Sequence, residues 1–148
     1  MDIKQAEVKD IDNWMQLVEK VKASFPGLET AEALEQHRQT ALDFFSRKAA
    51  ICAITDNRIA GALLFSKDEN MLCFLAVDPD YRRQGIAKQL VYDMLKHLDS
   101  EKNVVVTTYR EGEPEGMAAR AFYKHLGFTE GRLTEEFGSP VQEFILIR

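Results

Sequence analysis

The chain has 148 residues, of which 45% are apolar and 29% are charged. This length and composition are typical of a soluble globular protein and of neither a disordered nor a membrane-spanning one, so we expect residues 1–148 to form a single domain. The net charge of −5 argues against nucleic acid as the main partner, because phosphate binding needs a basic face, and solubility alone explains it.

The sequence shows no signal for a membrane or for secretion. No apolar run approaches the roughly 20 residues that cross a bilayer, and the start MDIKQAEVKD lacks the basic and then apolar plan of a signal peptide. We therefore expect a cytoplasmic protein without a membrane partner.

The cysteines and histidines do not form a metal-binding pattern. Cys52 and Cys73 both lie in apolar, strand-like runs, so we expect small buried side chains in a reducing compartment rather than a disulfide. His37, His97 and His125 are scattered and match no metal-ligand spacing. No metal is expected.

The first part of the chain predicts a strand and then two helices. Asp2–Val8 has a weak strand pattern, and Lys9–Ala23 has helical spacing with Asp10 as the expected N-cap. Ser24–Gly27 should end that helix, and a second helix is predicted from about Thr30 to Arg47. The expected inward faces comprise Ile11, Trp14, Met15, Val18 and Val21 in the first helix, and Leu34, Ala41, Leu42 and Phe45 in the second.

The middle of the chain predicts three antiparallel strands. AAICAIT and IAGALLF flank a turn at Asp56–Arg58, and the turn SKDEN leads to MLCFLAV at residues 71–77. An amphipathic helix should then begin near Gln84, with its apolar face formed by Ala87, Leu90, Val91, Met94, Leu95 and Leu98.

The last part predicts strand, helix and strand. VVVTTY at 104–109 reads as a buried strand, Met117–Leu126 as a helix that Gly127 ends, and VQEFILI at 141–147 as a strand, with one less distinct strand before it. The predicted fold is therefore α/β (α+β), a mixed and mostly antiparallel sheet flanked by helices, in the order β-α-α-β-β-β-α-β-α-β-β.

The stretch VDPDYRRQGIA, from Val77 to Ala87, has the features of an anion site. Pro79 ends the strand, and the first N–H groups of the next helix have no internal acceptor while the helix dipole adds partial positive charge. Gly85 lets a ligand approach the backbone, and Arg82 and Arg83 offer forked donors for phosphate oxygens. The alternative is a plain turn with solvated arginines. Neither G-x-G-x-x-G nor the P-loop motif is present.

Together, LAVDPDYRRQGIAKQL and AARAFYKHLGF resemble the GNAT superfamily of acetyl-coenzyme A-dependent N-acetyltransferases, and the predicted order of elements is similar to that family's over essentially the whole chain. The resemblance implies an enzyme that moves an acetyl group from acetyl-coenzyme A to a primary amine of a small molecule or protein. Its partners would be coenzyme A and an amine acceptor, as a monomer or a homodimer. The alternative is a non-catalytic acyl-coenzyme A-binding regulatory module.

The resemblance also implies site residues. The diphosphate would be held by Arg82, Arg83, Gln84, Gly85, Ile86 and Ala87, and pantetheine would pair with the backbone of Leu75, Ala76 and Val77. The backbone N–H of Leu75 would polarise the acetyl carbonyl, and Tyr123 would protonate the leaving thiolate, its alternative being a core aromatic ring. Many family members have Asn where this chain has Gly116, seven residues before the tyrosine.

The sequence does not identify a general base. MLCFLAV and VVVTTY contain no carboxylate. Glu111 and Glu113, in the loop after the second of these strands, are candidates, although a solvated acidic loop is the commoner meaning of such residues. Glu29, Glu32, Glu35 and His37 are weaker candidates, and a chain of water molecules is a further alternative. The acceptor itself is not predicted.

Overall fold

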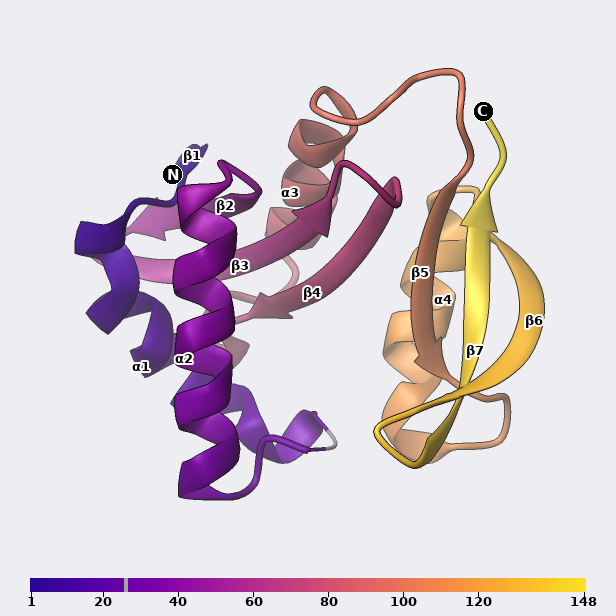
Figure 1. Cartoon of the computed structure of the whole chain (residues 1–148), viewed down its shortest axis with the longest axis horizontal. Helices are drawn as coiled ribbons and strands as arrows, with labels where there is room; N and C mark the ends of the chain where they lie inside the picture. Colours follow the sequence, from indigo (N-terminus) through magenta and orange to yellow (C-terminus); the bar gives the residue numbers. More distant parts are fainter. Residues whose placement is uncertain (26) are drawn as a thin grey trace.

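Seven strands form one sheet in the order β1-β2-β3-β4-β5-β7-β6 in the computed structural model, which describes residues 1–25 and 27–148 (Figure 1). All neighbours are antiparallel except β4 and β5, which run parallel. The predicted mixed, mostly antiparallel α/β fold and its order of elements are confirmed. The strands are β1 Asp2–Gln5, β2 Ala50–Thr55, β3 Arg58–Ser66, β4 Met71–Val77, β5 Val104–Tyr109, β6 Thr129–Glu136 and β7 Ser139–Leu146.

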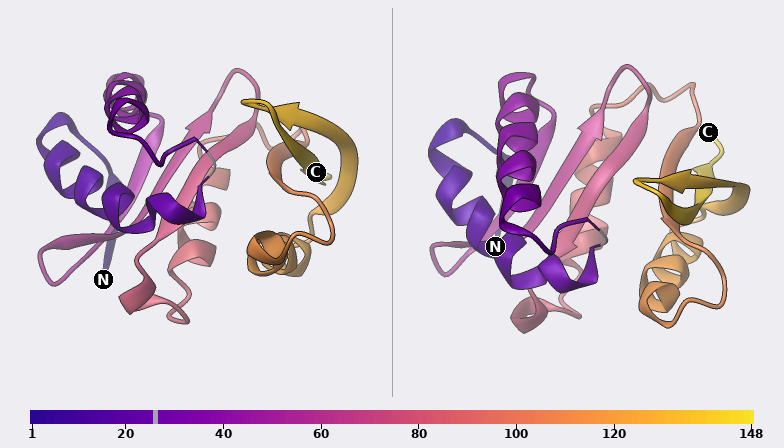
Figure 2. Two further views of the ribbon diagram at one scale, coloured as in Figure 1. Left: turned by 90° about the horizontal axis from the view of Figure 1, so that it is seen from below. Right: turned by 60° about the horizontal axis from the view of Figure 1, so that its bottom comes forward.

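Helices cover both faces of this sheet (Figures 1 and 2). α1 (Ile11–Val21) and α2 (Ala31–Ser46) pack on one face, and α3 (Ile86–Leu95) and α4 (Met117–His125) on the other. In the part of the chain that the structure describes, four short 3-10 helices join the elements: η1 Val8–Asp10, η2 Lys22–Ser24, η3 Pro79–Tyr81 and η4 Pro114–Gly116. No helix among residues 1–25 and 27–148 has the length and apolar character to cross a membrane.

The first two helices differ from the prediction mainly at their ends. Asp10 precedes α1, but its carboxylate accepts from the Glu7 N–H (2.8 Å) and from Lys4 Nζ (2.6 Å), because η1 comes between strand and helix. α2 begins after Thr30, whose hydroxyl oxygen accepts from the Ala33 N–H at 3.0 Å. The predicted break between them includes Pro26, which lies outside the described residues.

The α1 face also shows one correction. Leu17 is buried there and the predicted Met15 is only half-buried, because the face turned to the sheet is centred closer to Trp14 and Val18. Trp14 is fully buried and meets Phe45 of α2 edge to face, with ring centroids 5.0 Å apart. Aromatic packing therefore joins the two helices above the sheet.

Two-residue turns fix the register of two hairpins. Asp56 and Asn57 have φ of 53° and 61° between β2 and β3, and Phe137 and Gly138 have φ of 52° and 78° between β6 and β7. Left-handed pairs of this kind match the twist of antiparallel strands. The second turn makes β7 begin at Ser139, two residues earlier than predicted.

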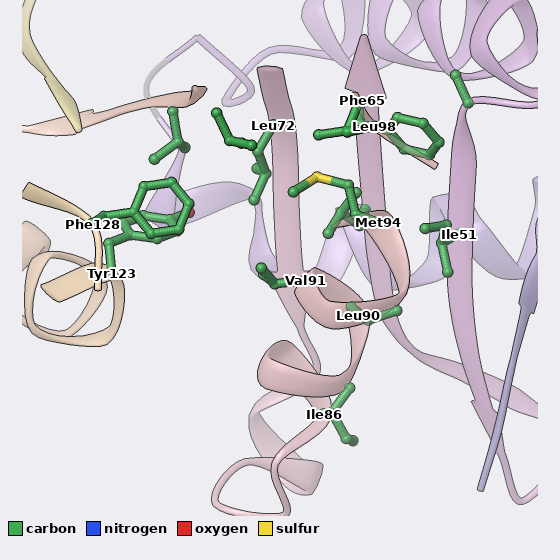
Figure 3. Packing of buried hydrophobic residues seen from close by; sticks show 14 of the residues in the cluster. Ile51, Phe65, Leu72, Ile86, Leu90, Val91, Met94, Leu98, Tyr123 and Phe128 are labelled. Atoms are coloured by element: carbon green, nitrogen blue, oxygen red, sulfur yellow. The ribbon is translucent and has the colours of Figure 1, made fainter. Parts of the chain in front are cut away.

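The core on the α3 side places the beginning of that helix close to the sheet. Ile86, Leu90, Val91 and Met94 are buried against β3 and β4 (Figure 3). Gly61 of β3 permits this approach, since a β-carbon there would stand 2.6 Å from Ile86 Cγ2 and 2.9 Å from Leu90 Cδ1. The absence of a side chain at Gly61 therefore lets the first turns of α3 pack close to β3.

Candidate active site

Strands β4 and β5 are paired over only two residues and then separate (Figure 1). Met71 faces Val105 and Leu72 faces Val106, after which β5 continues to Tyr109 against β7 and β4 continues to Val77 against β3. Within the described residues, the β4 edge from Cys73 to Val77 therefore has no strand on its β5 side. Such an edge offers backbone N–H and C=O groups to an extended ligand. We call the point of separation, between Cys73 and Thr107, the fork.

Asn70 holds the closed end of the fork. Its side chain is buried, and Nδ2 lies within hydrogen-bond distance of three backbone oxygens just before β5, those of Asp99, Lys102 and Asn103, at 3.1–3.3 Å. Its Oδ1 accepts from the Asp99 N–H at 2.9 Å, and the Val105 N–H donates to the Asn70 carbonyl at 3.2 Å. One amide thus ties the start of β4 to the start of β5.

A β-bulge opens the fork at Cys73. Leu64 of β3 faces Phe74 and Phe65 faces Leu72, which leaves Cys73 as the extra residue of β4. Bulges bend a strand and turn its edge away from the ladder. Cys73 is exposed for this reason, so the prediction that both cysteines are buried is wrong for Cys73 and confirmed for Cys52.

The Cys73 thiol is held in its neutral form. Its pKa is raised to about 11, first by the protein that packs on one side of it and then by the carboxylates of Glu69 and Glu136. A neutral thiol is a poor nucleophile. We therefore do not assign the Cys73 thiol a role as nucleophile, although it lies at the fork.

The segment after β4 is anchored before it reaches α3. Lys20 of α1 contacts Asp78 Oδ1 at 2.8 Å and Asp80 Oδ2 at 2.7 Å. Burial alone would raise the Asp78 pKa, but hydrogen bonds from Lys20 and from the Asp80 N–H outweigh it and lower this pKa. The Tyr81 hydroxyl donates to Asp56 Oδ2 at 2.9 Å, which ties the segment to the β2–β3 turn.

The predicted phosphate loop is exposed, and it leads into N–H groups at the start of α3 that have no acceptor within the described residues. Arg82, Arg83, Gln84 and Gly85 are all exposed, and α3 begins at Ile86 rather than near Gln84, because Gly85 is left-handed with φ of 76°. The first bond of the helix runs from the Gln89 N–H to the Gly85 carbonyl (3.0 Å), so the N–H groups of residues 86–88 have no acceptor in the helix. This is a place where an anion is favoured.

The remaining predicted positions of the phosphate loop can contribute to an anion site through their backbone N–H groups. Arg83 is left-handed with φ of 65°, and a β-carbon on Gly85 would meet nothing within 4 Å. Left-handed residues in a turn point neighbouring N–H groups to one side. The Ile86 side chain is buried against Gly61, so only its N–H faces the loop, while Ala87 is half-buried.

The three β4 residues predicted to pair with pantetheine, Leu75, Ala76 and Val77, form part of the unpaired edge. Ala76 is buried toward α1 and α2, and Leu75 and Val77 are half-buried toward α3. Along the opposite edge of β4, Leu75 is the cross-strand partner of Leu63 on β3. Any contact these residues make across the fork is therefore made by their backbone.

Tyr123 projects from α4 into the core on the α3 side. The residue is 6% exposed, and its ring lies 5.6 Å from the Phe128 ring and 6.2 Å from the Phe144 ring. Figure 3 shows its ring directed toward Leu72 of β4 and Val91 of α3. Burial raises the Tyr123 pKa well above its ordinary value, so the phenol stays protonated at neutral pH. Tyr123 is thus a core ring whose hydroxyl keeps its proton and can donate it in a hydrogen bond.

His37 does not have the properties of a base. Its Nε2 accepts the indole N–H of Trp14 at 3.2 Å, and its ring lies 4.7 Å from that of Phe74. Tryptophan can only donate, so this lone pair is occupied. Burial lowers the His37 pKa to about 4. The predicted carboxylates Glu111, Glu113, Glu29, Glu32 and Glu35 are all exposed, as the solvated alternative predicts.

The end of β5 makes contacts that the sequence did not indicate. The Tyr109 hydroxyl donates to the Ser24 carbonyl at 3.0 Å, across the open side of the fork, and Arg120 Nη1 donates to the Tyr109 carbonyl at 2.8 Å. The Arg120 side chain is buried over the Phe144 ring, 4.8 Å from guanidinium carbon to centroid. The two hydrogen bonds of Tyr109 join residues that are 85 and 11 positions apart in the sequence, so no local sequence pattern could predict them.

A carboxylate does reach the fork, from a distant strand. Glu136, the last residue of β6, accepts a hydrogen bond from the hydroxyl of Thr107 on β5. Glu136 lies on neither of the strands that separate and outside the loop after β5, so its sequence position does not mark it as a candidate base. No group of three or more residues able to hold a metal ion occurs in residues 1–25 and 27–148.

Comparison with known proteins gives one family. Residues 14–128 match the model of the acetyltransferase (GNAT) family. A [ribosomal protein bS18]-alanine N-acetyltransferase of Escherichia coli strain K12 is 39% identical over 70 residues. This segment is 47% of the chain and 46% of that relative, so the chain spans about half the length of the curated relatives it matches.

Solved structures share the fold over nearly the full chain. A GNAT acetyltransferase of Bacillus cereus superposes with a TM-score of 0.77 at 19% identity, covering 99% of this chain and 96% of the other. The PaiA N-acetyltransferase of Thermoplasma acidophilum, crystallised with coenzyme A, gives 0.71 at 17% identity and 96% of both chains. At these identities the likeness concerns the fold.

Proposed function

The chain belongs to the GNAT family of acetyltransferases, and on that premise we propose that it transfers an acetyl group from acetyl-coenzyme A to a primary amine of a small molecule or protein. One observation carries the proposal: the β4 edge Cys73–Val77, unpaired within the described residues, is followed by the loop of residues 82–85 and by the N–H groups of residues 86–88, which have no acceptor in α3. An extended arm that ends in a diphosphate matches this arrangement. We also propose that residues 1–148 act as one domain in the cytoplasm.

The coenzyme would be held mainly by backbone. The diphosphate would accept from the N–H groups of Gly85, Ile86 and Ala87, with the Arg82 and Arg83 guanidinium groups and Gln84 beside it. Pantetheine would add to the β4 edge at Leu75, Ala76 and Val77 as a short strand. The Leu75 N–H would polarise the acetyl carbonyl.

The reaction is direct attack of a neutral amine. The nitrogen lone pair forms a bond to the carbonyl carbon, the carbon–sulfur bond breaks, and the sulfur takes a proton. Tyr123 is the proposed donor to that sulfur, because it lies protonated on the α3 side of the fork. Its raised pKa makes complete proton transfer harder, so donation of a hydrogen bond to the developing thiolate is the larger part of its role.

An α-amino group is the acceptor to test first. Supplying the neutral form at pH 7 costs a lysine side chain, with pKa ~10.4, about 4.6 kcal/mol, and an α-amino group, with pKa ~7.8, only about 1 kcal/mol. The curated relatives are named for acetylating an alanine of ribosomal protein bS18. Both points favour the amino terminus of a protein.

Free thiol release tests the function. The protein would be incubated with acetyl-coenzyme A and a panel of a peptide with N-terminal alanine, the same peptide with a blocked terminus and one lysine, and spermidine. Turnover with any of them supports the proposal. A thermal shift by coenzyme A without turnover would support the regulatory module, which the named N-acetyltransferase relatives disfavour. If coenzyme A does not change the melting temperature at all, the proposal that the protein binds coenzyme A is wrong.

A further inference from the structure

We propose that Glu136, at the end of β6, is the catalytic residue that accepts the proton of the attacking amine; this rests on the proposed acetyl transfer. The carboxylate comes from the C-terminal hairpin and not from β4 or β5, where the sequence has none. Three features place the Glu136 carboxylate: its contact with Thr107, the curl of the β6–β7 hairpin, and the face of the sheet on which Glu136 and Thr107 lie.

The contact with Thr107 puts the carboxylate at the fork. Val106 is the last β5 residue that pairs with β4, and Thr107 follows it directly. The Thr107 hydroxyl donates to Glu136 Oε2, which leaves the other carboxylate oxygen free to accept from a ligand. Across the fork, the Cys73 thiol has its pKa raised in part by the same carboxylate.

The hairpin reaches this position because it curls over β5. In sheet order β7 separates β6 from β5, yet Figure 1 shows the β6–β7 hairpin crossing the end of β5. Arg110 holds the curl, since its Nη2 donates to the Thr134 carbonyl at 2.8 Å and its Nε to the Val141 carbonyl at 3.1 Å. The two-residue turn then places Glu136 as the last paired residue before Phe137, which is 91% exposed.

Glu136 and Tyr123 lie on opposite sides of the split sheet. Val106 belongs to the core on the α3 side with Tyr123, so its neighbour Thr107 points to the other face. Tyr109 shares that face and reaches Ser24, between α1 and α2. The amine and the leaving sulfur must occupy different sides of the carbonyl carbon, and the two proposed groups are placed accordingly.

The coenzyme's direction brings the reacting carbon near the fork. Its phosphates lie after Val77, so an arm that runs back along β4 brings the acetyl carbonyl to the Leu75 N–H, two residues from Cys73 and the fork. There the nitrogen attacks and the sulfur leaves with its electron pair. The nitrogen gives one proton to the Glu136 carboxylate, which passes it to water, and the sulfur is protonated from the Tyr123 side.

The test compares Glu136→Gln with Glu135→Gln, which makes the same charge change on the exposed neighbour. With the acceptor on which the wild type is active, Glu136→Gln should lower turnover about 100-fold or more while coenzyme A still raises the melting temperature. Glu135→Gln should change neither. Unchanged turnover in Glu136→Gln overturns the proposal. If Glu136→Gln does not fold, Thr107→Val replaces it, and unchanged turnover there also counts against the proposal.

A second readout does not depend on turnover. Iodoacetamide should alkylate Cys73 faster in Glu136→Gln, because each unit by which the thiol pKa falls raises the thiolate fraction about tenfold. Glu69→Gln should speed alkylation as well but leave turnover intact. If Glu136→Gln leaves the alkylation rate unchanged, the Glu136 carboxylate does not lie near Cys73 at the fork, and the proposal is wrong. A wild type inactive on the whole panel contradicts the proposed function instead.

Discussion

The ring of Tyr109 lies directly on Gly116: a β-carbon at position 116 would stand 2.2 Å from Tyr109 Cβ and 2.7 Å from Cγ. No other residue fits there while Tyr109 keeps its place. The resemblance gave Asn at this position in many family members, and the structure supplies a physical reason for the difference. Tyr109 fills the space from β5 and uses its hydroxyl to reach Ser24.

Gly116→Asn should therefore destabilise the protein by about 1–3 kcal/mol, because the new side chain overpacks the site. Chemical denaturation measures the loss, and Ala118→Asn, at an exposed position of α4, is the control and should cost much less. Combining Gly116→Asn with Tyr109→Ala should recover part of the stability. Additive effects in the double variant would refute the contact.

Gly85→Glu should abolish coenzyme A binding and leave the fold intact. The β-carbon at position 85 points into open space, so the main structural cost is the left-handed backbone, about 1–2 kcal/mol. Gly85→Gln has the same strain without the charge and should bind measurably better than Gly85→Glu. Calorimetric titration with coenzyme A gives both affinities, and retained binding in Gly85→Glu would place the diphosphate elsewhere.

Tyr123→Phe should lower turnover about 100-fold while coenzyme affinity and melting temperature stay near those of the wild type. The ring remains packed against Phe128 and Phe144, so only the hydroxyl is tested. Tyr92→Phe, on the exposed side of α3, serves as control. Equal turnover in Tyr123→Phe would leave Tyr123 as a core residue alone.

Acid should weaken the fold through His37. Its pKa is about 4 when folded and ~6.5 when unfolded, so between these values the unfolded chain binds more protons and the free energy of unfolding falls as pH falls. The full effect is about 3 kcal/mol, reached near pH 4 and absent above pH 7.

His37→Gln isolates this contribution. Its amide oxygen can accept from Trp14 but does not titrate, whereas the buried carboxylates of Asp10 and Asp78 are present in both proteins and lose their stabilising effect only at lower pH. Denaturation at pH 4.5, 5.5 and 7 should show a shallower decline for the variant. Parallel declines would exclude His37 as the cause.

Local patterns predicted the elements that depend on local physics. The α3 face repeats at helical spacing, the Asp56–Asn57 pair matches a hairpin turn, and both were found within two residues. The anion-site features between Val77 and Ala87 were also local, because a strand end, a glycine and a helix start follow one another directly. This stretch of the candidate site was accessible to sequence reasoning for that reason.

The remaining features arise from contacts between distant strands. β6 is an edge strand rich in exposed charged and polar residues, so its alternation is weak. The exposure of Cys73 follows from a bulge that depends on its pairing with β3. Glu136 reaches Thr107 only because the hairpin curls, which no spacing in the chain reveals.

The separation of β4 from β5 also gives the protein a reporter of its own occupancy. Amide protons on the free edge between Cys73 and Val77 should exchange with solvent as fast as those of loops, while their neighbours bonded to β3 exchange slowly. Any molecule that adds to this edge should slow the fast set alone. Hydrogen exchange along five consecutive residues can therefore rank unidentified cell extracts for a ligand before its chemistry, or any reaction, is known.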